Sequence, residues 1–241
     1  MLHLLEYLLV FLIGAIIGWI FEVFFKRYIG DRKKWVNPGF LAGPFLPIYG
    51  TGACLIYAIS KLPINLLIKV VLFAVLTTSI EYLTGVFFLK KFHVRLWDYT
   101  NVKFNIKGHI APLFTGIWTV MSIGFYYLLY PNLHNQVTFL YNHLEFSLFL
   151  GFFYGVIFID LIHSINLVSK LKIIMDSIGD SEAFVHYEKL KLDVQDKIDH
   201  LKNKLKSRPT FMLPFNGEYN LKQRVAFHLA KLKEEVESRH K

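Results

Sequence analysis

The sequence predicts an all-α, polytopic membrane helix bundle with five transmembrane helices and a cytoplasmic C-terminal helical hairpin. Three observations support this fold class: the composition, the spacing of the apolar runs and the distribution of the basic residues. Of the 241 residues, 54% are hydrophobic and 17% are aromatic, and the mean hydropathy is +0.40. These values fit an integral membrane protein better than a soluble domain of the same length.

Five apolar runs reach the roughly 20 residues that a helix needs to cross a bilayer. We expect the spans at about 4–25, 39–60, 64–89, 109–130 and 145–168. They make up a predicted transmembrane domain over 1–168, followed by a helical tail over 169–241. The first run has no Lys or Arg before it and is long enough to remain as a span, so we expect no cleavable signal peptide.

The basic residues separate between alternate connections. The 26–38 and 90–108 loops are rich in Lys and Arg, and so is the tail. The 131–144 loop has neither residue, and the turn after the second span has only Lys61. Because basic loops stay in the cytoplasm, this pattern predicts the N-terminus outside and the tail inside. The formal charge of +9 is then explained by topology, and we expect no binding of nucleic acid.

The segment 37–50 is apolar but contains three prolines and three glycines. Each proline removes a backbone donor, and within a bilayer the freed groups must face protein or a water-filled cavity. A similar interrupted start follows the third span, which suggests a weak parallel repeat of spans one and two in spans three and four. We expect structural helix breaks at Gly39, Gly43, Pro44, Pro47, Gly50, Gly108 and Pro112.

Two glutamates are candidates for chemistry inside the membrane. Glu81 lies well within the third span, where an acid should face protein or water, either as a proton or cation site or as a hydrogen-bonded structural residue. Glu22 lies one helical turn before Lys26, so an i,i+4 ion pair is as good an explanation as a site role. If the two carboxylates meet in a low dielectric, the pair is suited to proton exchange.

Further polar residues are predicted to form a lid over the cytoplasmic mouth of the bundle. Asp98 either caps a turn, pairs with Arg95 or joins this lid, and His109 taken alone is more often a satisfied interfacial histidine than a ligand. The full set predicted to bind substrate is Glu22, Asn37, Glu81, Trp97, Asp98, Asn105 and His109.

The sequence indicates neither a cofactor nor a metal. Asp160 and His163 share one helix face, but no further ligands complete a metal site, so we expect a buried Asp–His hydrogen bond. The single cysteine, Cys54, excludes an intramolecular disulfide. The chain has no phosphate-binding loop, dinucleotide-binding turn or nucleophile elbow, and any ATP hydrolysis would need another subunit.

The tail contains two amphipathic stripes separated by Pro209, Pro214 and Gly217. One runs from Leu190 to Leu205, and the other runs from Leu221 to Val236. Two such helices could form a hairpin, pair with another copy of the chain or lie on the membrane. Of these roles, we expect the tail to dock a partner or to self-associate.

The stretches Gly18–Glu22, Asn37–Gly50, Glu81–Gly85, Trp97–Tyr99 and Asn105–Gly108 form an ordered set of motifs. This set resembles the ABC-transporter permease family called CmpB, or type IV. The likeness covers roughly residues 5–125 and leaves out the fifth span and the tail. It implies a bacterial plasma-membrane permease, but no established substrate or catalytic residues. The positions that match the family's motifs are Trp19, Glu22, Asn37, Gly39, Gly43, Pro44, Pro47, Tyr49, Gly50, Glu81, Gly85, Trp97, Asp98, Tyr99, Asn105 and Gly108.

The leading functional hypothesis is therefore a transport component with a cytoplasm-facing polar pocket, surrounded by membrane lipids. It is expected to be a homo-oligomer and to work with a separate ATPase subunit. One alternative is a membrane-embedded enzyme acting on a lipid or isoprenoid carrier, with Glu22, Glu81 and His109 as acid–base groups. The other is a non-catalytic scaffold or sensor that docks a partner through its tail.

Overall fold

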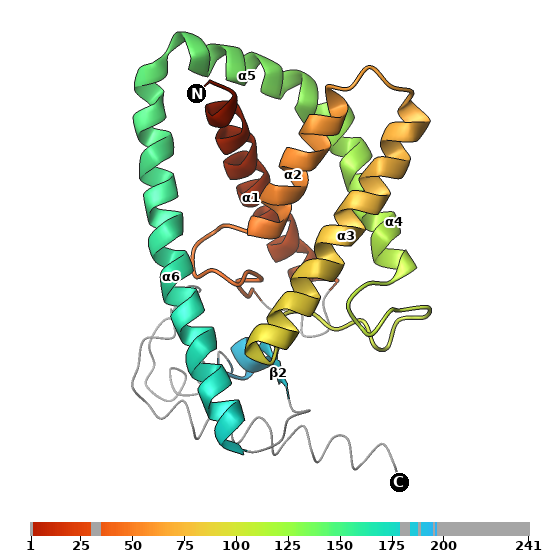
Figure 1. The fold of residues 1–241 in the computed structure, drawn as a ribbon, viewed down its shortest axis with the longest axis vertical. Coiled ribbons are helices and arrows are strands. Elements are labelled where there is room, and N and C mark those ends of the chain that lie inside the picture. Colours follow the sequence, from red (N-terminus) through yellow and green to blue (C-terminus); the bar gives the residue numbers. More distant parts are fainter. Residues whose placement is uncertain (1, 30–34, 179–183, 188, 195, 197–241) are drawn as a thin grey trace. The chain divides into compact units, whose positions relative to one another are not determined.

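The computed structural model describes residues 2–29, 35–178, 184–187, 189–194 and 196. Over these residues the fold is all-α apart from two strands of two residues each (Figure 1). The elements, in order, are α1 (Leu2–Tyr28), α2 (Pro47–Ser60), α3 (Leu66–Phe92), β1 (Val94–Arg95), α4 (Pro112–Gly124), the π-helical turn η1 (Phe125–Leu129), α5 (Tyr130–Asn142), the short helix η2 (Leu144–Phe146), α6 (Ser147–Ile178) and β2 (Val185–His186).

Four helical segments in the described residues are long and apolar enough to cross a membrane. They are His3–Tyr28, Leu66–Phe92, Pro112–Asn142 and Leu144–Ile173. The predicted all-α class is confirmed, and the chain is a multi-pass membrane protein. The orientation of these helices relative to the cytoplasm stays a prediction.

The second predicted span is shorter than expected. We expected helix from residue 39, whereas α2 begins at Pro47 and has 14 residues. Pro47 stands in the first turn, where its missing N–H has no intrahelical partner to lose. The preceding segment, residues 35–46, is non-helical and runs back to the bundle, where Leu46 N donates to Ala15 O at 3.0 Å.

The fourth span is longer than expected. We placed its end near residue 130, but α4, η1 and α5 form one continuous helical path to Asn142. Pro131 would normally interrupt an α-helix. A π-turn directly before it, in which Tyr130 N donates to Phe125 O, accommodates the proline without ending the helix.

The α1 and α2 helices pack closely because small residues line their contact. A Cβ on Gly14 would collide with the side chain of Ala53, and one on Gly18 would collide with the ring of Tyr49. Gly50, which we expected at a helix break, lies inside α2, where a Cβ would come within 2.8 Å of Phe11 O. Close approach of the two backbones, the use that membrane helices make of small residues, explains this glycine.

Hydrogen bonds tie the other helices into the same bundle. The Thr78 hydroxyl of α3 donates to the Thr115 hydroxyl of α4 at 3.1 Å. Tyr154 of α6 donates to Leu8 O of α1 at 2.8 Å. Within a bilayer such bonds satisfy groups that lipid leaves unpaired.

The chain divides into two compact units. The first comprises Met1–Val86 and Asp98–Ser164, and the second comprises Phe87–Trp97 and the chain from Ile165 onward. Within the second unit, β1 pairs with β2 in parallel, with Val94 opposite Val185, and both valines are fully buried. Most of the predicted tail hairpin, including the whole stripe 221–236, lies outside the described residues.

Candidate functional site

Glu22 lies near the C-terminal end of α1, where two groups hold its carboxylate. The Tyr49 hydroxyl, from the first turn of α2, donates to Glu22 Oε2 at 2.9 Å. Lys26 Nζ is 4.0 Å from Glu22 Oε1, and the glutamate side chain keeps 26% of its surface exposed. The i,i+4 ion pair between Glu22 and Lys26 predicted from the sequence is therefore present, at the longest distance that counts as an ion pair. It leaves Glu22 open to water and joined to Tyr49.

Glu81 is far more enclosed. Its residue exposure is 2%, and the Tyr99 hydroxyl donates to its Oε1 at 2.9 Å. Trp118 of α4 also interacts with this carboxylate, but no donor lies in hydrogen-bonding geometry to Oε2. The Tyr99 ring is fixed in turn by stacking on Phe114 at 3.9 Å between centroids. Glu81 thus has one firm hydrogen bond and one buried oxygen without one.

The two glutamates belong to one constellation. Glu81 interacts electrostatically with Glu22, and the Tyr49 hydroxyl, which is bonded to Glu22, also interacts with Glu81. The ring of Tyr49 lies 4.6 Å from that of Trp118. Side chains from α1, α2, α3, α4 and the 98–111 loop therefore converge on one place, which we call the Glu22–Glu81 site (Glu22, Tyr49, Glu81, Tyr99 and Trp118).

Asn37 and Asn105 organise the two loops beside this site. Asn37 accepts from Trp19 Nε1 at 3.0 Å and from Gly39 N at 3.1 Å. It also donates to the carbonyls of Leu41 and Ala42. These bonds satisfy backbone groups that the 35–46 segment leaves outside any helix.

Asn105 plays the corresponding part in the second loop. It accepts from Gly108 N at 2.9 Å and donates to the carbonyls of Thr100 and Val102. Gly108 has a φ of 71°, a conformation that glycine adopts without steric cost. The two asparagines therefore act alike in the two halves of the proposed repeat, holding turns together.

The remaining predicted site residues lie in different surroundings. Asp98 is exposed and accepts from Thr100 N at 3.0 Å, which makes it a turn residue. His109 is buried, with 4% of its surface exposed, and its ring packs edge to face against the Tyr82 ring at 5.9 Å between centroids. Trp97 is half-buried and belongs to the second compact unit.

A comparison with protein families identifies the chain. The family model described as "Putative ABC-transporter type IV" matches residues 9–165, well over half of the sequence. The chain belongs to the type IV ABC-transporter family. Comparisons with curated proteins and with solved structures found no match.

The family match is longer than the resemblance suggested. We expected it to end near residue 125, whereas it continues through most of α6. In this type IV ABC-transporter chain α6 contributes Asp160, whose carboxylate accepts from Ala42 N at 3.0 Å and from Gly43 N at 2.7 Å. A Cβ on Gly43 would stand 3.1 Å from Asp160 Oδ2, so glycine leaves room for this contact.

Asp160 does not bond to His163 as the sequence suggested. Its bonds run to the 42–43 backbone and to the Ser164 hydroxyl, which donates at 3.3 Å, while His163 is exposed. Within the described residues, no three His, Cys, Asp or Glu side chains are grouped as a metal ion would require.

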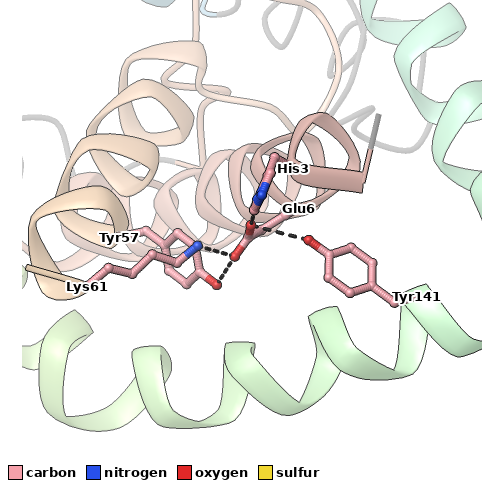
Figure 2. A network of polar contacts seen from close by, with 5 residues as sticks. All are labelled: His3, Glu6, Tyr57, Lys61 and Tyr141. Atoms are coloured by element: carbon pink, nitrogen blue, oxygen red, sulfur yellow. Dashed lines mark hydrogen bonds and ion pairs between the residues drawn. The ribbon is translucent and has the colours of Figure 1, made fainter.

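Sequence reasoning missed a second buried glutamate, Glu6, near the start of α1. Figure 2 shows its carboxylate surrounded by His3, Tyr57, Lys61 and Tyr141. The Tyr57 hydroxyl donates at 2.5 Å, the Tyr141 hydroxyl lies at 3.3 Å, and Lys61 forms an ion pair. The signal was present, because Glu6 interrupts an apolar run and Lys61 is the one Lys or Arg in the connections predicted on its side of the membrane.

Proposed function

We propose that the chain is the membrane-embedded transport component of an ABC-type transporter and that its solute contacts the Glu22–Glu81 site. The observation that carries this proposal is that Glu22 of α1 accepts from Tyr49, that Glu81 of α3 interacts with Trp118 and with Glu22, and that the rings of Tyr49 and Trp118 lie 4.6 Å apart. Acids inside a membrane are costly, and they mark solute or ion pathways more often than they stabilise a fold.

The proposal places this site toward the cytoplasmic side. Glu22 is one turn before Lys26 and Arg27 at the end of α1, and α3 ends with Lys90 and Lys91. Under the positive-inside rule these basic ends face the cytoplasm of a bacterial plasma membrane. Asn37 and Asn105 hold the two flanking loops, and Asp98 and His109 lie in the chain segment that contains Asn105.

Energy for transport would come from a separate subunit. The sequence has no phosphate-binding loop for ATP, and family membership suggests an ATPase partner. The described residues form four long apolar helices and one short one, which make a small bundle. A second copy of the chain would enlarge it. Both partners are parts of this proposal.

The test uses membrane vesicles from cells that express the full chain and from cells that lack it. Both are given ATP and a filtered cell extract as the source of solutes, and the vesicle contents are compared by mass spectrometry. We expect at least one solute whose content depends on the chain and returns to background in Glu81→Gln. Identical contents with and without the chain would overturn the proposal.

A matched control is available within the chain. Glu145 lies in η2 with 68% of its side chain exposed, so Glu145→Gln makes the same chemical change away from the site. This variant should keep the solute difference. If Glu145→Gln and Glu81→Gln behaved alike, the assignment of the site would fail.

A further inference from the structure

We propose that Glu81 is a proton-binding site, protonated near neutral pH and exchanging its proton with the cytoplasmic side through Tyr49 and Glu22. This inference rests on the proposed function, because it makes the proton a ligand of the transport site. The proton is the ligand class that fits best, since it needs only the buried oxygen that lacks a donor, Glu81 Oε2.

The first argument concerns the charges around Glu81. Among the residues that the structure describes, the side chains that interact with Glu81 are Tyr99, Trp118 and Glu22, with Tyr49 close by. None of them is a cation, and the one charged neighbour is another acid. Lys26, one helical turn beyond Glu22, lies 4.0 Å from the Glu22 carboxylate. A carboxylate with 2% exposure and an acidic neighbour is far costlier than a neutral carboxyl.

The second argument is the contrast with Glu6 in the same helix bundle. Glu6 is equally buried, at 4%, but it has an ion pair with Lys61 and two tyrosine donors. The Glu6 carboxylate therefore has a cation and hydrogen-bond donors that offset the cost of burying its charge. At Glu81 the fold supplies the Tyr99 hydroxyl and the nearby Trp118 side chain but no cation, and it leaves Oε2 without a donor in hydrogen-bonding geometry, which suits a neutral acid.

The third argument is a route to water. Glu22 keeps 26% of its side chain exposed and accepts from the Tyr49 hydroxyl. Tyr49 and Glu81 interact only electrostatically and share no hydrogen bond, so the proposed transfer takes place when side-chain movement brings the Tyr49 hydroxyl to Glu81 Oε2. In the proposed transfer the O–H bond of Glu81 breaks. The Tyr49 hydroxyl takes that proton and gives its own to the carboxylate of Glu22, which then releases it to water. Tyr49 is unchanged at the end, and one proton has moved from Glu81 to solvent.

The experiment is infrared spectroscopy of the purified full chain in lipid vesicles near neutral pH. We expect a carbonyl band of a protonated carboxylic acid that is lost in Glu81→Gln and remains in Glu145→Gln. Glu81→Asp, which keeps a carboxyl group, should retain a shifted band. A spectrum of the parent protein without such a band, or one that Glu81→Gln leaves unchanged, would overturn the proposal.

A second measurement tests the route. After transfer into D₂O, the Glu81 band should shift more slowly in Tyr49→Phe and in Glu22→Gln than in the parent protein, while Glu145→Gln should match the parent. Equal exchange in all four proteins would refute the route through Tyr49.

These results separate this inference from the proposed function. If the solute difference in vesicles depends on the chain but the acid band is absent, the proton site fails and the transport proposal stands. If the band is present but no solute difference is found, the transport role fails and the protonated Glu81 remains.

Discussion

The two buried glutamates Glu6 and Glu81 lie near opposite ends of the helix bundle and differ in the groups that surround their carboxyl oxygens. Glu6 and Glu22 are separated by about 24 Å along α1, at 1.5 Å per residue. Glu6 lies in a closed network with Lys61, Tyr57, Tyr141 and His3 (Figure 2). Glu81, beside Glu22, has a tyrosine, a tryptophan and a second acid. Burial alone therefore does not reveal the role of an acid, whereas its partners do.

The Glu6 network is best explained as a structural tie. It joins α1, the end of α2 and α5, and the Lys61 ammonium also lies 4.5 Å from the centre of the Tyr57 ring. A buried charge with a cation and several donors is satisfied in one arrangement. In the Glu22–Glu81 site, by contrast, the acceptor Glu81 Oε2 has no donor, which suits the binding and release of a ligand.

The largest expected effect on stability is that of Lys61→Met. Removing the cation leaves Glu6 buried with neutral donors only. We expect a loss of about 3 kcal/mol, the lower end for a broken buried pair, because the Lys61 side chain is 37% exposed. Thermal unfolding in detergent measures it, with Lys103→Met, at an exposed lysine, as the control. Equal melting temperatures for the two variants would contradict a structural role for Glu6.

The next largest effect on stability is expected for Gly18→Ala, which lies beside the Glu22–Glu81 site. The added methyl group would collide with the Tyr49 ring, and overpacking of this kind costs about 1–3 kcal/mol. It should also disturb the Tyr49–Glu22 bond and lower the solute difference in vesicles. Gly116→Ala is the matched control, since nothing lies within 4 Å of its added Cβ. If the two variants melt alike, α2 is not packed on α1 as described.

Two tyrosine variants compare the regions directly. A hydrogen bond to a charged group contributes about 1.5–3 kcal/mol and one between neutral groups about 1 kcal/mol. Tyr57→Phe should therefore cost about 2 kcal/mol, because Glu6 is charged. Tyr99→Phe should cost about 1 kcal/mol if Glu81 is neutral. Melting temperatures of both variants test this order, and the reverse order would mean that Glu81 carries the charge.

The smallest effect is expected for His3→Ala. The ring contacts Glu6 at 3.3 Å, but 91% of the His3 side chain is exposed. An exposed partner is screened by water and adds little. We expect no measurable change in melting temperature, and a clear fall would show that the Glu6 network depends on its water-facing member.

Much of the fold was predictable because bilayer crossing needs long apolar runs. Four of the five predicted spans correspond to long helices. The second did not, because Pro44 and Pro47 prevent helix from continuing back through residues that look apolar. The end of the fourth was missed because a π-turn, which has no simple sequence signature, lets the helix pass Pro131.

The site was predictable in part. Glu22 and Glu81 were recognised as candidate acids, but Tyr49 was noted only as a position that matches the family's motifs, and Trp118 was not singled out. Their contribution comes from side-chain packing between helices, which periodicity does not record. Asn37 and Asn105 were predicted to bind substrate, and this stays a prediction. The structure shows that their amides also bond to the backbone of their own loops, a role that the sequence did not indicate.

The most direct measurement compares the melting temperatures of Glu6→Gln and Glu81→Gln with that of the parent protein in the same detergent. The two substitutions are identical in chemistry and occur at equally buried positions. If partners decide the role of a buried acid, Glu6→Gln lowers the melting temperature clearly, while Glu81→Gln leaves it unchanged or raises it. A comparable fall in both variants would contradict the account, because it would make Glu81 a structural acid like Glu6.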